Sequence, residues 1–174
     1  MKKVSIIQSR QSGFNLIELL GVIAVVAFLL IVVLTKIGQA NDKATVERER
    51  GRVLTIKNAI QDIYGGRSNY QGLNNSVLLA GTSLTTDMRS STTQIRNAWR
   101  DAGFVITPSG GNNTYTITSV GVPDEFCFDL VNAINPGNVE FESLTVNGGA
   151  VNNPTDALSR CKSSANTIAW IGRR

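Results

Sequence analysis

The chain has 174 residues and a mass of 18.7 kDa, enough for one domain with a buried core. It contains no histidine, which excludes the catalytic triads, metal sites and pH switches that depend on that side chain. Two cysteines exclude a cysteine-rich zinc module and allow at most one disulfide. The formal net charge is +4.

This positive charge is concentrated at the N-terminus. Lys2, Lys3 and Arg10 occur there without any acidic residue, whereas residues 66–174 hold eight basic and eight acidic residues. A nucleic-acid-binding protein carries clustered basic residues on its folded domain. The sequence therefore predicts no nucleic-acid partner.

A long apolar segment follows the basic start. Residues 19–34 contain no charge, and residues 14–35 are interrupted only by Asn15 and Glu18. As a helix, residues 14–35 would be about 33 Å long, close to the thickness of the bilayer core. Because the basic residues precede it, the N-terminus is expected in the cytoplasm and the rest of the chain across the membrane.

Two simple interpretations of this segment are weak. A secretory signal peptide could be cut after Gly38-Gln39-Ala40, but the apolar run exceeds the usual length of about 7–15 residues and Lys36 lies before that site. A plain anchor, for example of a periplasmic binding protein, leaves Glu18 unexplained, because an unpaired acid within a membrane span is costly.

Residues 12–20 read SGFNLIELL. A basic leader ends at Gly13, the hydrophobic Phe14 follows, Glu18 lies four positions later, and the apolar run continues from there. The segment resembles the N-termini of type IV pilins and of the related type II secretion pseudopilins. The resemblance implies a leader peptide over residues 1–13 and a transmembrane and filament-core helix over residues 14–35.

The same resemblance implies what these residues do. A prepilin peptidase would cut between Gly13 and Phe14, and the new amine of Phe14 would be N-methylated. That ammonium would lie about 6 Å along the helix axis from the Glu18 carboxylate, in the same chain or in a neighbour. Glu18 would then neutralise an amine during assembly and set the axial register of the subunits. The alternative is that Glu18 only caps the start of the helix.

The helical pattern changes character after residue 35. Residues 36–64 lack proline, and their apolar positions recur at helical spacing, at Val53, Ile56, Ile60 and Ile63. Gly65-Gly66 is a plausible helix end. We therefore predict an amphipathic stem over residues 36–65, whose stripe is buried against the head. A single helix over residues 14–64 would be about 75 Å long, so its hydrophobic half is expected to project from so small a domain.

Residues 66–174 form the predicted head. We expect strands over residues 104–107, 114–118, 139–146 and 167–171, with a turn at 108–113, and short helices over residues 94–101 and 123–134. The order of long helix, short helices and mostly antiparallel strands predicts an α+β fold, with the sheet packed on the helix, as in type IV pilins.

Cys127 and Cys161 lie 34 positions apart in this head. In the oxidising periplasm they are expected to form a disulfide, worth roughly 3–4 kcal/mol in the chain-entropy model. Two reduced, buried cysteines would suit a cytosolic protein instead. In type IV pilins a C-terminal disulfide commonly bounds an exposed variable region, and this pair resembles it.

The resemblance implies a structural subunit rather than an enzyme. The chain would sit in the inner membrane before assembly, meet the pilus assembly machinery there, and form a homo-oligomeric extracellular filament for adhesion, aggregation or conjugative mating contact. The stem end over residues 56–70 resembles the type IVb pilins, with the thin-pilus pilins of conjugative plasmids and enteric bacteria as the closest group. A minor pilin or a type II secretion pseudopilin is the alternative.

The sequence carries no motif for other chemistry. It has no Walker loop, dinucleotide-binding fingerprint, HExxH or GxSxG. We therefore expect no catalytic residues, no cofactor and no metal site.

Overall fold

A computed structural model describes residues 15–81, 83–135, 141–162 and 164–173, without the side chains of residues 35–40. Its contacts divide the chain into two units, Met1–Asn41 and Asp42–Arg174. The helix α1, Leu16–Tyr64, contributes residues to both units.

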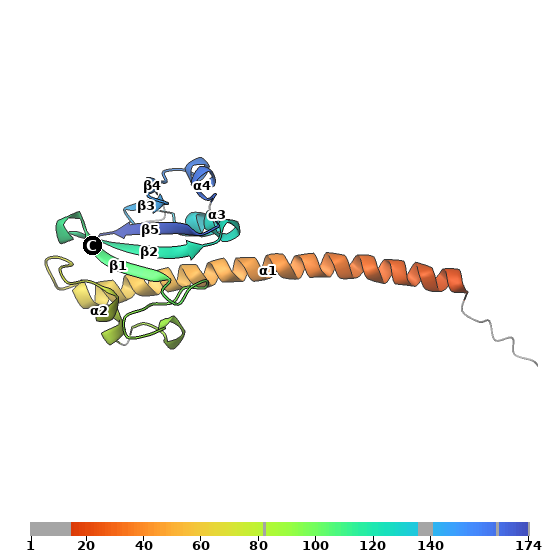
Figure 1. The fold of residues 1–174 in the computed structure, drawn as a ribbon, viewed down its shortest axis with the longest axis horizontal. Helices are drawn as coiled ribbons and strands as arrows, with labels where there is room; N and C mark the ends of the chain where they lie inside the picture. The colour runs from red at the N-terminus through yellow and green to blue at the C-terminus, as the bar shows by residue number, and fades with distance from the viewer. Residues whose placement is uncertain (1–14, 82, 136–140, 163, 174) are drawn as a thin grey trace, which may run out of the picture. The chain divides into compact units, whose positions relative to one another are not determined.

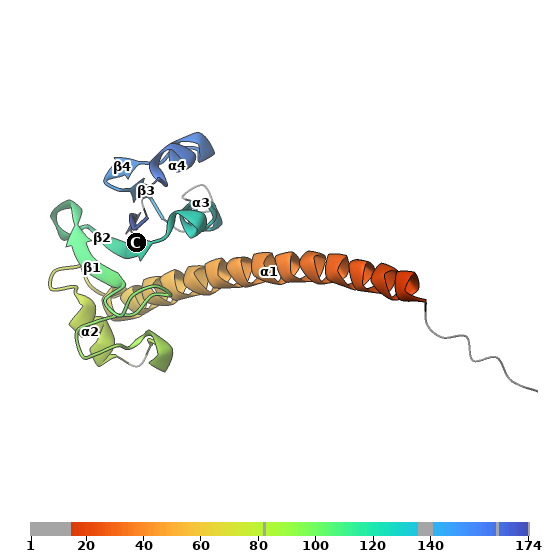
Figure 2. The same ribbon diagram turned by 45° about the vertical axis from the view of Figure 1, so that its right-hand side comes forward.

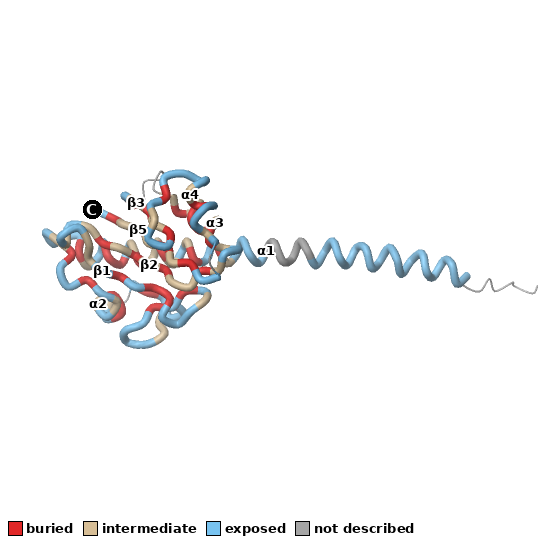
Figure 3. The backbone as a smooth tube through the Cα atoms, turned by 45° about the horizontal axis from the view of Figure 1, so that its top comes forward, coloured by how far each residue is buried: buried red, intermediate tan, exposed pale blue. Residues whose placement is uncertain are grey.

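In the first unit, α1 has no buried side chain among its described residues (Figure 3). Leu16–Leu34 has a mean hydropathy of 3.1, and by length and composition this part of the helix could cross a membrane. A helix that is apolar on every face needs lipid or other helices around it.

In the second unit, α1 buries one stripe in the core of the head. Val53, Ile56 and Ile60 are fully buried, and Ile63 packs against the same cluster. The predicted stripe is confirmed. The helix ends where expected, because the Gly65 N–H donates to the Gln61 carbonyl at 2.7 Å and a Cβ at position 65 would lie 2.6 Å from that oxygen.

The sheet has five antiparallel strands, in the order β1-β2-β5-β3-β4 (Figure 1). They are β1 (Phe104–Ser109), β2 (Thr114–Val122), β3 (Ser143–Val146), β4 (Gly149–Ala150) and β5 (Asn166–Gly172). The register aligns Ile106, Ile117, Trp170 and Leu144 in one row across four strands, and all four are buried. One face of the sheet therefore supplies much of the core, together with the stripe of α1.

Short helices flank the two ends of this sheet. They are α2 (Asn75–Ala80), α3 (Asp124–Ala133) and α4 (Pro154–Arg160), with 3-10 turns η1 (Thr86–Met88) and η2 (Gly110–Asn112). α2 lies beside β1, whereas α3 and α4 lie together near β3 and β5 (Figures 1 and 2). Asn74 caps α2 and Asn153 caps α4, each through its side-chain oxygen.

The predicted hairpin, the helix at 123–134 and the last strand are confirmed, but the helix predicted over residues 94–101 is wrong. Residues 94–101 form no helix, because the buried Asn97 side chain accepts hydrogen bonds from the Trp99 and Arg100 N–H groups, and Ile95 bridges Phe104 instead. The strand expected over residues 139–146 is confirmed over Ser143–Val146, residues 141 and 142 precede it outside the strand, and residues 139 and 140 lie outside the described residues.

Candidate functional site

The first candidate residue, Glu18, lies in the first turn of α1. The Asn15 carbonyl accepts hydrogen bonds from the backbone N–H groups of Glu18 and Leu19, at 2.9 and 3.1 Å, and so begins the helix. The Glu18 side chain is exposed. An acid at this position is favoured by the helix dipole and is open to a partner from another chain. Gly13 and Phe14, the predicted processing residues, lie outside the described residues.

The apolar side chains after Glu18 form the second element of the site. Every large hydrophobic residue from Leu16 to Leu34 is exposed, with exposed fractions from 40% at Val32 to 75% at Leu16. Exposed apolar surface of this extent marks an interaction with a membrane or with other protein. The arrangement places one carboxylate at the start of an otherwise apolar helix surface.

A second acid on α1 has the opposite environment. Glu49 is completely buried in the head, and one of its oxygens accepts a hydrogen bond from Arg52 Nη1 at 2.6 Å. Arg52 Nη2 reaches Asp87 of η1 at 2.9 Å. Glu49 Oε2 accepts no hydrogen bond in the described structure, although the backbone of Ala98 faces this carboxylate.

These environments shift the pKa values of Glu49 and Asp87. Burial raises the pKa of Glu49, and the charge of Arg52 opposes this shift without cancelling it. The pKa of Asp87 is lowered by hydrogen bonds from the Thr85 side chain and from Arg52. The network thus ties the loop around η1 to the stem, and within it Glu49 is the acid whose charged form is disfavoured by burial. Glu49 was not predicted as a functional residue, although it lies four residues before Val53 on the buried stripe.

A disulfide joins Cys127 of α3 to Cys161 at the end of α4, with 5.6 Å between the two Cα atoms. The predicted pairing is therefore present. Cys127 is fully buried, and the Cys161 N–H donates to the Ala157 carbonyl at 2.9 Å. The bond holds the two short helices against each other at one end of the sheet.

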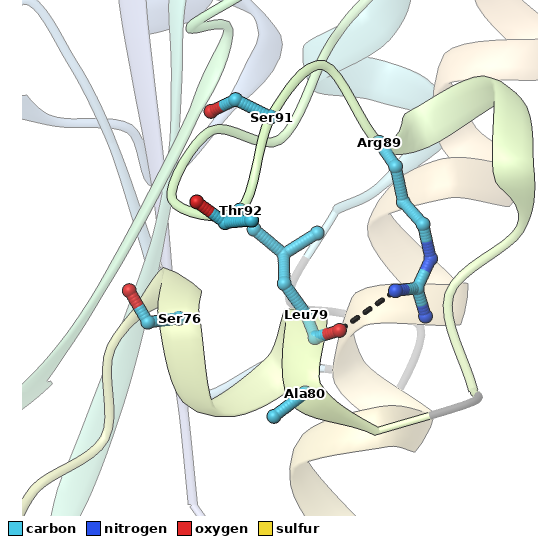
Figure 4. A pocket seen from close by; sticks show the side chains of 6 residues that line it. All are labelled: Ser76, Leu79, Ala80, Arg89, Ser91 and Thr92. Carbon is cyan, nitrogen blue, oxygen red and sulfur yellow. Dashed lines mark hydrogen bonds between the residues drawn. The ribbon is translucent and has the colours of Figure 1, made fainter.

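The hollow beside α2 has a volume of about 430 Å³ and contains a charged side chain, Arg89 (Figure 4). The guanidinium of Arg89 donates to the carbonyls of Leu79, at 2.7 Å, Gly81 and Leu84. Its donors hold the C-terminal end of α2, where carbonyl groups lack helical partners. Arg89 is therefore a structural residue of this hollow.

The described residues contain no group of three or more aspartate, glutamate or cysteine side chains that could hold a metal ion.

Tyr115 is another described residue with a shifted pKa. Burial raises the pKa of its hydroxyl, and the neighbouring Tyr70 adds to this shift. Tyr115 packs edge-on against Tyr70 at 5.1 Å, which makes it a core residue at the stem end.

The comparison with known proteins decides the family. Residues 43–173 match the sequence profile of the family described as PilS N terminal. The chain belongs to this family of type IV pilins. Among solved structures, this pilin is similar to TcpA, a type IV pilin from Vibrio cholerae El Tor biotype. The TM-score is 0.53 at 16% identity, over 74% of this chain and 99% of that one. No curated protein matches this pilin in sequence.

Family and fold together account for the architecture. The match to TcpA shows the type IV pilin fold, a long N-terminal helix followed by a head of antiparallel strands. Type IV pilins are structural subunits of pili and polymerise into filaments outside the cell. The apolar surface over Leu16–Leu34 suits a membrane anchor in such a subunit.

Proposed function

We propose that this pilin is a type IVb subunit that polymerises through residues 14–35, after a prepilin peptidase has cut the bond between Gly13 and Phe14. The observation that supports it is the exposed apolar surface of α1 with Glu18 at its start. This surface needs lipid before assembly and neighbouring helices afterwards, and one set of side chains serves both.

Glu18 is proposed to pair with the N-methylated amine of Phe14, within its own chain or in a neighbouring subunit. An unpaired carboxylate among apolar groups is costly, and the new ammonium removes that cost. A subunit at the correct axial offset satisfies the charge, and one at a wrong offset does not. Glu18 would thereby select the stagger of the helices in the filament.

In the cell, the N-terminus is proposed to lie in the cytoplasm, with the helix in the inner membrane until the assembly machinery extracts it. Four functional segments follow from this proposal, which are the leader 1–13, the core helix 14–35, the stem 36–65 and the head 66–174. The filament would serve adhesion, aggregation or conjugative mating contact, a structural rather than a catalytic role. The type IVb assignment rests on the stem end over residues 56–70.

The N-terminal sequence and mass of the envelope-bound protein test the processing step. We expect a chain that begins at methylated Phe14 and retains residues 14–35. A chain that begins at Asn41 would instead identify a secretory signal peptide cut after Ala40, and would overturn the proposal.

Electron microscopy of sheared filaments tests the role of Glu18. We expect Glu18→Ala to abolish filaments while the protein remains in the membrane, and Glu125→Ala, at an exposed acid on α3, to leave them intact. Filaments at the wild-type yield in Glu18→Ala would contradict the proposed pairing. Wild-type filaments that contain this chain only in trace amounts would identify a minor pilin.

A further inference from the structure

The part of α1 in the second unit has a face that no described residue of the chain covers. At 100° per residue, six positions of this part of α1 lie within about 40° of the direction opposite the buried Val53. We call them the outward face, and they are Ala44, Arg48, Gly51, Thr55, Asn58 and Asp62. All are exposed except Thr55, which is half-buried, and a Cβ built on Gly51 would have no neighbour within 4 Å.

Two members of the outward face are charged and have opposite signs. Neither Arg48 nor Asp62 forms an ion pair or side-chain hydrogen bond in the described structure, whereas nearby Glu47 pairs with Arg50 at 3.7 Å and Arg52 is held by Glu49 and Asp87. Arg48 and Asp62 are fourteen positions apart, nearly four complete turns, so they point to the same side about 21 Å apart along the helix. They cannot reach each other within one chain.

We propose that the outward face is a self-docking surface, in which Asp62 of one copy pairs with Arg48 of a second, parallel copy that is offset by about 21 Å. This inference rests on the proposed polymerisation. All copies enter the filament from the same membrane, which makes their helices parallel. Parallel copies arranged around a shared axis all turn this face toward that axis. With about a quarter of a turn between successive copies, the copy that returns to the position of the first lies about 84 Å along the axis, beyond the end of a helix about 75 Å long. The two charges of neighbouring copies then meet only at this offset.

The composition of the outward face suits such a contact. Ala44 and Gly51 have little or no side chain, so a second helix can approach closely around Arg48. The first copy contributes Asp62 to the contact and the second contributes Arg48. The Arg48 of the first copy and the Asp62 of the second therefore stay free to pair with further copies. A contact of this kind adds further copies instead of closing into a dimer.

A single exposed ion pair stabilises little, and its main effect here is to select the register. A copy at the correct offset places Arg48 against Asp62, and one at another offset leaves both charges without a partner. The pair would therefore act on the stagger of the stems, separately from Glu18 in the first unit.

A charge-reversal series in the full-length pilin, expressed with its assembly machinery, tests this contact. We expect Arg48→Glu and Asp62→Arg each to lower filament yield by roughly fivefold, and the double variant to return to within about twofold of wild type. Arg160→Glu, at an exposed position on α4, is the control and should not change the yield. Single reversals without effect, in a wild type that does form filaments, would overturn the contact and leave the proposed polymerisation intact.

Cross-linking locates the contact independently of yield. Filaments of an Arg48→Cys, Asp62→Cys double variant, treated with a short bis-maleimide, should give a ladder of linked subunits, and each single variant should not. Lys57→Cys with Asp62→Cys is the matched control, since Lys57 lies on another side of α1, over the Phe141 ring at 5.6 Å. A ladder in the control alone, or equal loss of filaments in the single and double reversals, would indicate a different occupant of this face and overturn the proposal.

Discussion

Residues 16–34 and residues 42–64 belong to the same helix, yet their side chains are distributed differently. The first region is apolar on all faces and has no buried side chain, whereas the second buries one stripe and exposes polar groups elsewhere. Glu18 is the one acid of the first region, and Glu49 is the one buried acid among the four of the second. Glu18 is exposed, and Glu49 is buried and paired with Arg52.

This difference separates folding from assembly within one element. The apolar groups of the second region find partners in their own chain, so changes there should alter the stability of the head. The apolar groups of the first region have no packing partners among the described residues, so changes there should alter membrane insertion or polymerisation instead. Each of the following predictions tests that division on the full chain in detergent, with the fluorescence of the buried Trp170 reporting unfolding.

The largest expected effect comes from the partner of the buried acid. Arg52→Ala should lower the free energy of unfolding by about 4 kcal/mol, because it leaves the Glu49 carboxylate buried without its counter-charge. Urea unfolding measures this loss. Arg48→Ala, at an exposed position four residues away, should change it by less than about 0.5 kcal/mol. Equal effects of the two substitutions would show that Glu49 does not depend on Arg52.

A comparison of two isoleucines tests the apolar side chains. Ile56→Ala should lower the free energy of unfolding of the head by about 3 kcal/mol, because it opens a cavity at a fully buried position. Ile23→Ala removes the same atoms from a side chain that is 56% exposed and should leave that free energy unchanged. Destabilisation of the head by Ile23→Ala would break the division between the two regions.

Neutralising the buried acid should have a smaller effect than removing its partner. Glu49→Gln loses the ion pair with Arg52 but also removes the cost of burying a charge, so the free energy of unfolding should change by less than about 1 kcal/mol. The same urea titration measures it, beside Arg52→Ala. A loss as large as that of Arg52→Ala would mean that the ion pair itself stabilises the head.

The smallest effect is a difference in pH dependence between wild type and Glu49→Gln. Because burial raises the pKa of Glu49, this carboxyl binds its proton more tightly in the folded chain, and wild type should gain stability relative to the variant as the pH falls from neutral toward 4.5. The lowered pKa of Asp87 acts in the opposite sense. The contribution of Asp87 to the free energy of unfolding is fully present above pH 3.8 and is lost as the pH falls through the lowered pKa of Asp87 in the folded chain.

Unfolding curves for both proteins at several pH values measure this difference. Asp87 is common to both proteins, so its effect cancels in the comparison. A constant difference across the range would show that the Glu49 carboxyl does not titrate there.

Several elements of the head could be predicted because their signals are local. The spacing of Val53, Ile56 and Ile60 and the glycines that follow define the stem, and turn residues between two β-branched runs define the β1–β2 hairpin. Asn153 before Pro154 is also a local signal, which could have identified α4.

Other features have no such signal. Residues 94–101 have the composition of a short helix, but the Asn97 side chain replaces the helical hydrogen bonds and donates to the carbonyl of Gly103 and to Ser119. Ser119 lies on β2, 22 positions along the chain from Asn97. The choice between helix and loop therefore depended on a buried polar group, which periodicity does not detect.

The amino-acid sequence by itself determined the long helix, its apolar half and the acid at its start, because helical periodicity and hydrophobic length depend only on residues close to one another along the chain. Only the tertiary structure decided the strand order, the burial of Glu49 and Asn97, and which face of the stem stays uncovered. Each of these depends on the contacts that distant segments make when they pack, and the identity of a single residue does not specify them.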